Sequence, residues 1–170
     1  MPMPVFKLIG DLSVDTGTWF RSMNEKVQSW IHTDKVFRVE EDEERMDNAL
    51  AEEIYELERC IECGCCVAAC GKANMAPEGF MGATAFNRIA RFMMDPRDQR
   101  STDEYFEVVG NDEGIFGCLG LLGCEDTCPK KIPLQDQLGI LRRKMGFSQV
   151  KHLFKTLIPG GHSHVGTKSM

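Results

Sequence analysis

Two short cysteine runs constrain this chain more than any other feature. When Cys65 is set aside, the first run reads C-x2-C-x2-C-x3-C, with Cys60, Cys63, Cys66 and Cys70. The second run keeps three of these four positions, as Cys118, Cys124 and Cys128. Several cysteines lie only two or three residues apart, which disfavours a disulfide framework and favours metal thiolates in a reducing cytoplasm.

The spacing of the first run favours iron over zinc. It is the spacing that winds three thiolates around one cubane-type iron–sulfur cluster and sends the fourth to a neighbouring cluster. Gly64 tolerates the backbone angles of such a tight loop, whose N–H groups would point at the sulfurs and tune the reduction potential. Structural zinc would instead use paired C-x2-C motifs, so a zinc-stabilised interaction module is the weaker alternative.

The second run differs from the first at one position, where Leu121 replaces the second cysteine. If the last cysteine of each run binds the other cluster, one site has four ligands. That [4Fe–4S] site would use Cys60, Cys63, Cys66 and Cys128. The other site would use Cys70, Cys118 and Cys124, which predicts a [3Fe–4S] cluster that is easier to reduce than its neighbour. Cys65 is left over, and we expect it to be a buried bystander.

The remaining sequence predicts an all-α fold with these two cluster-binding segments. Apolar spacing predicts helices over about 18–31, 47–58, 82–94, 102–109, 133–145 and 147–157. The apolar stripe expected for the first helix is Trp19, Met23, Val27 and Trp30. Residues 1–15 are expected to be extended, without a hairpin. We divide the chain into a linker and helix over 1–46, a two-cluster domain over 47–147, and a C-terminal helix and frayed tail over 148–170.

Charge and hydropathy exclude several classes of function. The net charge is −6, which argues against general affinity for nucleic acid or anionic lipid. No stretch approaches the roughly 20 apolar residues of a membrane span. Residues 40–58 hold ten acids and one arginine, whereas residues 142–155 hold five Lys or Arg and no acid. We interpret both segments as solvated faces, with docking surfaces for different partners as the sharper alternative.

No nucleophile–base pair is evident, so we expect no substrate-converting site in this chain. His162 and His164 lie in a glycine-flanked tail that we expect to be without function rather than to bind metal. Four arginines, Arg88, Arg91, Arg97 and Arg100, are expected to brace acidic residues such as Asp95 and Asp98.

The motifs resemble the iron–sulfur subunit of succinate dehydrogenase and fumarate reductase, specifically its C-terminal helical-ferredoxin domain. The resemblance covers about residues 1–147 and is carried by both cysteine runs and by residues 80–95 and 114–118. Residues 91–98 resemble the family's arginine-phenylalanine and aspartate signature. Within the family, the likeness is greatest to bacterial fumarate reductases that work with a dihaem membrane subunit and menaquinone.

The resemblance implies an electron-transfer subunit of an oxidoreductase complex. Such a subunit relays electrons between a flavoprotein (FAD) subunit and a membrane-anchor haem and quinone subunit, peripheral to the cytoplasmic side of the inner membrane. A free-standing dicluster ferredoxin or a heterodisulfide reductase-like subunit is the alternative. It would predict two complete cysteine runs, and Leu121 argues against that.

The chain departs from the family pattern in three places. No cysteine precedes Cys60, so a [2Fe–2S] cluster is expected only in a missing N-terminal domain or a separate chain, with truncation favoured. Gly71 follows Cys70 where many members have proline, which predicts a looser turn. Leu119 stands where some members have a quinone-lining histidine, so we transfer no quinone site to this chain.

Overall fold

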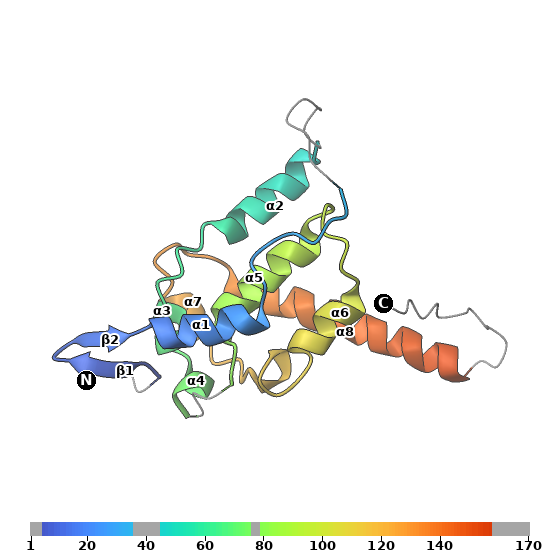
Figure 1. Ribbon diagram of the computed structural model, residues 1–170. Coiled ribbons are helices and arrows are strands. Elements are labelled where there is room, and N and C mark those ends of the chain that lie inside the picture. Colours follow the sequence, from blue (N-terminus) through green and yellow to red (C-terminus); the bar gives the residue numbers. More distant parts are fainter. Residues whose placement is uncertain (1–4, 36–44, 76–78, 158–170) are drawn as a thin grey trace.

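Helices dominate the computed structural model, which describes residues 5–35, 45–75 and 79–157 (Figure 1). The longer helices are α1 (Gly17–Lys26), α2 (Asn48–Glu58), α5 (Gly82–Met94), α6 (Thr102–Val109) and α8 (Leu134–Leu157). Three very short helices, α3 (Cys65–Ala68), α4 (Gly71–Met75) and α7 (Gly123–Asp126), and the 3-10 turn η1 (Ile115–Gly117) lie around the cysteine runs. The predicted helical fold is thus confirmed.

A short hairpin near the N-terminus corrects the prediction that this segment has no strand pairing. β1 (Lys7–Gly10) pairs antiparallel with β2 (Ser13–Asp15). Asp11 in the turn has φ 52°, a conformation that aspartate tolerates better than most residues. The strands are largely exposed and the turn is not of the Asn-Gly or Asp-Gly type, so neither sequence signal for a hairpin is present.

The first long helix ends earlier than predicted. α1 stops at Lys26, and Val27 is extended (φ −115°, ψ 101°). Arg88 of α5 donates hydrogen bonds to the Val27 carbonyl at 3.5 Å and to Ser29 Oγ at 2.8 Å, which hold the chain in this extended path. Trp30 therefore leaves the expected stripe: its side chain is 59% exposed, and its ring stacks on His32.

α5 is the central helix and has its predicted bounds. It packs against α2, α3, α6 and α8, and most of its residues are buried. Its polar side chains are used to hold other segments, since Asn87 Nδ2 donates to the Leu57 carbonyl at 2.9 Å and Arg88 pairs with Glu62. These contacts fix the end of α2 and the first cysteine run relative to the core.

α8 is a single helix where we predicted two helices that meet near residue 146. It starts at Leu134, one residue after the predicted start at Pro133. Leu138, Leu141 and Met145 are buried on one side of it. Gly146 lies inside the helix with open space around it, and a lone helical glycine costs only about 1 kcal/mol relative to alanine. That cost is too small to end a helix that packing already holds.

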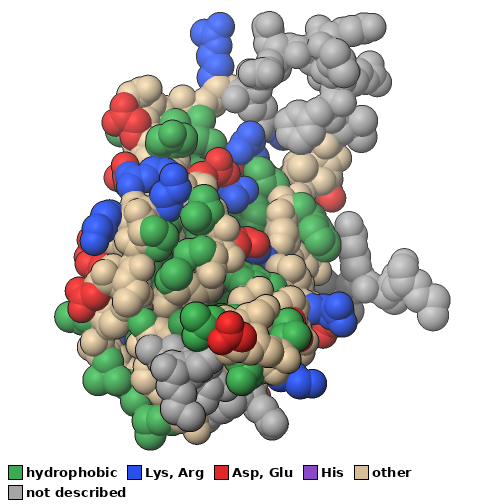
Figure 2. Space-filling model, turned by 90° about the vertical axis from the view of Figure 1, so that its left-hand side faces the viewer, with side chains coloured by type: hydrophobic (Ala, Val, Ile, Leu, Met, Phe, Trp, Pro, Cys, Tyr) green, Lys and Arg blue, Asp and Glu red, His purple; other side chains and the backbone are tan. Residues whose placement is uncertain are grey.

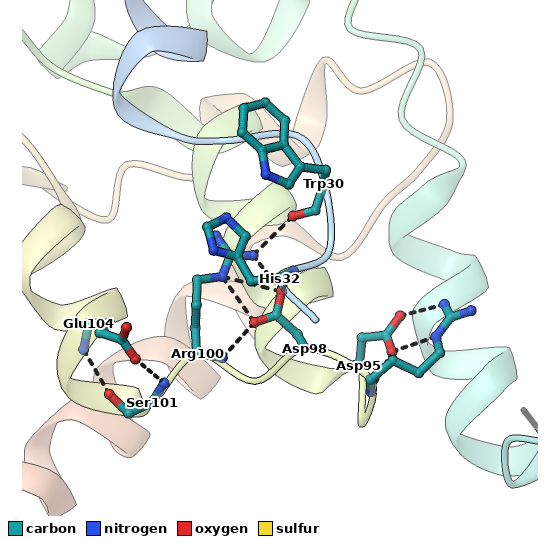
Figure 3. A network of polar contacts seen from close by, with 8 residues as sticks. Trp30, His32, Asp95, Asp98, Arg100, Ser101 and Glu104 are labelled. Carbon is teal, nitrogen blue, oxygen red and sulfur yellow. Dashed lines mark hydrogen bonds and ion pairs between the residues drawn. The ribbon is translucent and has the colours of Figure 1, made fainter. Parts of the chain in front are cut away.

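Two buried carboxylates anchor the turn that follows α5 (Figure 3). Asp98 accepts a hydrogen bond from Arg100 Nη2 at 2.6 Å and another from the backbone N–H of His32 at 3.2 Å. Asp95 accepts from Arg97 Nη2 at 2.6 Å. The prediction that Arg97 and Arg100 brace these two aspartates is confirmed.

The Asp98 pair adds a pH-dependent contribution to stability. Burial alone would raise the pKa of the Asp98 carboxyl, but hydrogen bonds from Arg100 and from the backbone outweigh burial and lower that pKa. A carboxyl with a lowered folded-state pKa stabilises the fold above its unfolded pKa. This stability is lost as the pH falls through the folded-state pKa of Asp98.

We expect Arg100→Met to lower the free energy of unfolding by about 3 kcal/mol, because it leaves the buried Asp98 carboxylate without its cation. Asp98 is 1% exposed and Arg100 is 14% exposed. Urea unfolding of the iron-loaded protein under anaerobic conditions measures the loss. Arg91→Met is the matched control, because its partner Glu58 is 46% exposed and the pair should contribute about 1 kcal/mol or less. Equal losses in both variants would contradict the assignment.

Candidate metal centres

The first cysteine run begins where α2 ends. The chain turns at Glu62 (φ 52°) and Gly64 (φ 79°) and then enters α3. A Cβ at Gly64 would lie 3.0 Å from the Phe6 ring, so the tight turn requires glycine for both space and conformation. The turn places three of the predicted ligands within seven residues, on one loop that packs against α5.

The four thiols predicted for the [4Fe–4S] cluster lie in one electrostatic neighbourhood. Burial raises the pKa of the Cys60 thiol, and the nearby thiols of Cys128 and Cys63 raise it further. Burial also raises the pKa of Cys66 to about 12, with added contributions from Cys60, from Cys124 of the other predicted site and from Cys63. Cys128 thus joins the first run, although it is distant in sequence. Bound metal would have to displace protons from these thiols.

The three cysteines predicted for the other cluster share one pocket. Cys70, Cys118 and Cys124 line it together with Leu121. Burial raises the pKa of Cys124, and the thiols of Cys70 and Cys118 raise it further. A Cβ on Gly71 would come within 2.7 Å of Leu121 Cδ1, so the glycine leaves room for this leucine. Three thiols beside an apolar side chain are a donor set that fits a three-iron cluster.

The second run repeats the backbone of the first. When the two runs are aligned, Glu62 corresponds to Gly120, and both have positive φ (52° and 68°). Gly64 corresponds to Leu122, and these two also have positive φ (79° and 61°). Each left-handed residue of the second pair precedes a helix of four residues, α3 in the first run and α7 in the second. The sequence repeat is therefore also a repeat of conformation.

The hydrogen bonds inside the two loops repeat as well. The equivalent bonds are Val67 N–H to Gly64 O (3.0 Å) and Glu125 N–H to Leu122 O (2.8 Å), then Cys70 N–H to Val67 O (3.1 Å) and Cys128 N–H to Glu125 O (3.1 Å). Leu121 therefore stands at the loop position that Cys63 occupies in the first run. This is the position that the sequence predicted to lack a ligand.

Hydrogen-bonding groups reach three of the sulfurs. Thr84 Oγ1 and Cys66 Sγ share a hydrogen bond of 3.0 Å in which either atom can donate, Gln135 Nε2 donates to Cys124 Sγ at 3.8 Å, and the Glu62 N–H donates to the Cys60 thiol. The backbone donor was expected from the sequence. Thr84 and Gln135 were not, because they come from α5 and α8, and their positions carry no local signal. Donors to sulfur tune the potential of an iron–sulfur cluster.

Other side chains brace the second loop. Arg142 of α8 donates from Nη2 to the carbonyls of Ile115 at 2.8 Å and Cys118 at 2.9 Å. Thr127 Oγ1 donates to the Gly123 carbonyl of its own loop at 2.8 Å and also lies 3.4 Å from the Cys65 carbonyl of the first loop. The second loop is therefore held by the long C-terminal helix and lies against the first loop.

Cys65 is exposed, so the expectation that it is buried is wrong. As the first residue of α3 it follows the turn at Gly64, and a hydrogen bond with the Cys63 thiol raises its pKa, ahead of burial. Its expected role as a bystander stays a prediction.

Several sequence expectations fall on other parts of the chain. His162 and His164 lie outside the described residues, as do residues 40–44 of the acidic segment 40–58. Within the described ranges, no three His, Cys, Asp or Glu side chains could share a single metal ion. No helix in that part of the chain is long and apolar enough to cross a membrane. At the hairpin end of the molecule, hydrophobic side chains lie among acidic and basic ones (Figure 2).

Comparison with known proteins matches the same region. Residues 56–132 match the 4Fe-4S dicluster domain family. The chain is 54% identical over 145 residues to the fumarate reductase iron-sulfur subunit of Wolinella succinogenes, which covers 85% of this chain and 60% of that protein. It is 29% identical over 153 residues to the succinate dehydrogenase iron-sulfur subunit of Bacillus subtilis, over 90% of this chain and 59% of that protein.

A solved structure shows the same fold. A chain of the Sdh1 complex of Mycobacterium smegmatis in the apo form superposes with a TM-score of 0.74 at 21% identity. The superposition covers 88% of this chain and 61% of that one. The present chain thus spans about 60% of the length of the relatives that it matches.

We expect Leu122→Gly to stabilise the protein by about 1 kcal/mol, because Leu122 adopts the left-handed conformation that disfavours a side chain. Leu122 is also 50% exposed, so little apolar burial is lost. Urea unfolding measures the gain. Leu119→Gly is the matched control, since Leu119 is a similarly exposed residue of the same loop without positive φ. It should lose stability, and a gain in both variants would refute the strain at Leu122.

Proposed function

We propose that the chain relays electrons between a flavoprotein subunit and membrane quinone, on the basis of its similarity to the iron–sulfur subunits of fumarate reductase and succinate dehydrogenase. In this role it is part of an oxidoreductase complex and converts no substrate itself. The two cysteine loops hold the carriers. The direction of turnover depends on the partner subunits.

One observation supports the proposal most strongly. The two cysteine loops share the same positive-φ positions and the same backbone hydrogen bonds, but Cys63 of the first loop corresponds to Leu121 of the second. A free-standing dicluster ferredoxin would use a full set of cysteines in both loops. Because Cys63 is a ligand and Leu121 cannot be one, this chain would instead hold two different carriers, a [4Fe–4S] and a [3Fe–4S] cluster. Two cluster types would give the relay two carriers of different potential.

Bound clusters supply one-electron transfer, and the chain's residues supply ligands, hydrogen bonds and proximity. Cys60, Cys63, Cys66 and Cys128 would hold the [4Fe–4S] cluster, and Cys70, Cys118 and Cys124 the [3Fe–4S] cluster. The thiol of Cys124 is close enough to raise the pKa of Cys66, so ligands of the two sites are neighbours. Short separation favours transfer between them.

The surface beside the second site suits a partner. Phe116, Leu119, Leu121 and Leu122 are each at least half exposed there. Isolated exposed apolar residues are ordinary, but a group of them around a redox site fits a protein interface. In this proposal the membrane-anchor haem and quinone subunit covers the second site, and the FAD subunit lies on the side of the first. The complex would then sit on the cytoplasmic side of the inner membrane.

The ligand count can be tested at the vacant position. Leu121→Cys should raise the iron content after anaerobic reconstitution from about seven to about eight atoms per chain. It should also abolish the EPR signal of the oxidised three-iron cluster, because a fourth thiolate becomes available. Leu119→Cys is the matched control and should leave both readouts unchanged. Eight irons in the parent protein would contradict the assignment.

The exchange of ligands between the loops gives a second test. Cys128→Ala should damage the four-iron cluster, although Cys128 belongs to the second run. Cys70→Ala should damage the three-iron cluster, although Cys70 belongs to the first. EPR spectra of the oxidised and reduced proteins distinguish the two losses. If each variant instead lost the cluster of its own run, the cross-over would be wrong.

A further inference from the structure

The two halves of α8 present apolar side chains on different sides. Leu138, Leu141 and Met145 are buried against the protein. At 3.6 residues per turn, the next apolar group lies roughly 150° around the helix from them. It consists of Phe147, Val150, Leu153 and Phe154, which are 63%, 48%, 58% and 59% exposed. We call these four residues the outer stripe of α8.

The outer stripe does not pack against the core of this chain. Ser148, on the other side of the helix, donates to Asp103 Oδ1 of α6 at 2.5 Å, so the side that faces the protein is already in use. Because α8 is continuous, it cannot rotate its second half independently of its first. In Figure 1 this half runs past α6 and away from the other helices.

The sequence segment that carries the outer stripe has charges of one sign. Residues 137–170 contain six Lys or Arg and no Asp or Glu, in a chain whose net charge is −6. Arg143 and Lys151 are exposed on the helix itself. Arg142 is committed to the carbonyls of the second cysteine loop and does not contribute. Arg143 lies on the face of the outer stripe, one turn before Phe147, and Lys151 flanks the stripe. The segment thus combines apolar and basic residues without acids, in contrast to the mixed charges at the hairpin end (Figure 2).

We propose that the outer stripe of α8 lies in the surface of an anionic lipid bilayer. A helix with exposed aromatic and aliphatic residues on one face and basic residues beside them is typical of helices that lie in the membrane interface. Anionic headgroups complement Arg143 and Lys151, and α8 is not apolar enough to cross the bilayer. This contact goes beyond the electron relay and involves none of the predicted cluster ligands.

Vesicle flotation of the full, iron-loaded chain tests the proposal. The protein should float with vesicles of phosphatidylcholine mixed with phosphatidylglycerol, and much less with phosphatidylcholine alone. Added salt should weaken the binding. The double variant Phe147→Ser with Phe154→Ser should lower the affinity by about tenfold or more, because both aromatic anchors are lost. Lys151→Glu should lower it as well.

Controls separate this contact from general stickiness and from misfolding. Tyr55→Ser removes a ring that is 66% exposed on α2 and should leave flotation unchanged. Iron content should be the same in all variants, since the outer stripe lies outside the core. Absence of flotation, or equal flotation of the double variant and the parent, would overturn the proposal. So would a dimer in sedimentation that the double variant abolishes, because the stripe would then bind a second copy. Failure of the electron relay would instead appear in the iron count and EPR.

Discussion

The close approach of two equivalent cysteine loops is the constraint on which the rest of the structure depends. If each loop is to give its last cysteine to the other site, α3 and α7 have to lie side by side, and they do. Gly123 makes this possible, because a Cβ there would come within 2.8 Å of the Ala69 carbonyl. The equivalent residue of the first loop, Cys65, is exposed, so its position has room for a side chain. The two loops therefore share a backbone conformation but differ in the side chains that fit at equivalent positions.

The surrounding helices act on these loops through polar contacts as well as packing. α5 provides the Thr84 hydroxyl beside Cys66, and α8 provides Gln135 beside Cys124. Arg88 of α5 holds Glu62 of the first loop, and Arg142 of α8 holds carbonyls of the second. Each loop thus receives one hydrogen-bonding group at a sulfur and one arginine from the same helix. A buried guanidinium that is fully hydrogen-bonded can fix such a loop because its donors have a rigid planar geometry.

The long apolar helices were predictable from sequence, whereas irregular segments were not. α5 and α6 have their predicted bounds, because apolar spacing, a terminating Asp95-Pro96 and a capping Ser101 all favour the same ends. α1 is shorter than its apolar spacing predicts, because hydrogen bonds from Arg88 favour an extended chain after Lys26. The hairpin at Asp11 was missed, since its exposed strands lack an alternating pattern. The division of the chain into three segments remains a prediction.

By itself, the sequence determined the fold class, which cysteines share a loop, and the replacement of a cysteine by Leu121 in the second run. These features follow from local spacing and from the repeat. Only the tertiary structure decided that Thr84 and Gln135 reach the sulfurs. It also decided that the outer stripe of α8 faces away from the core. Such contacts join residues far apart in the chain, and their formation depends on how whole helices pack, which no local pattern encodes.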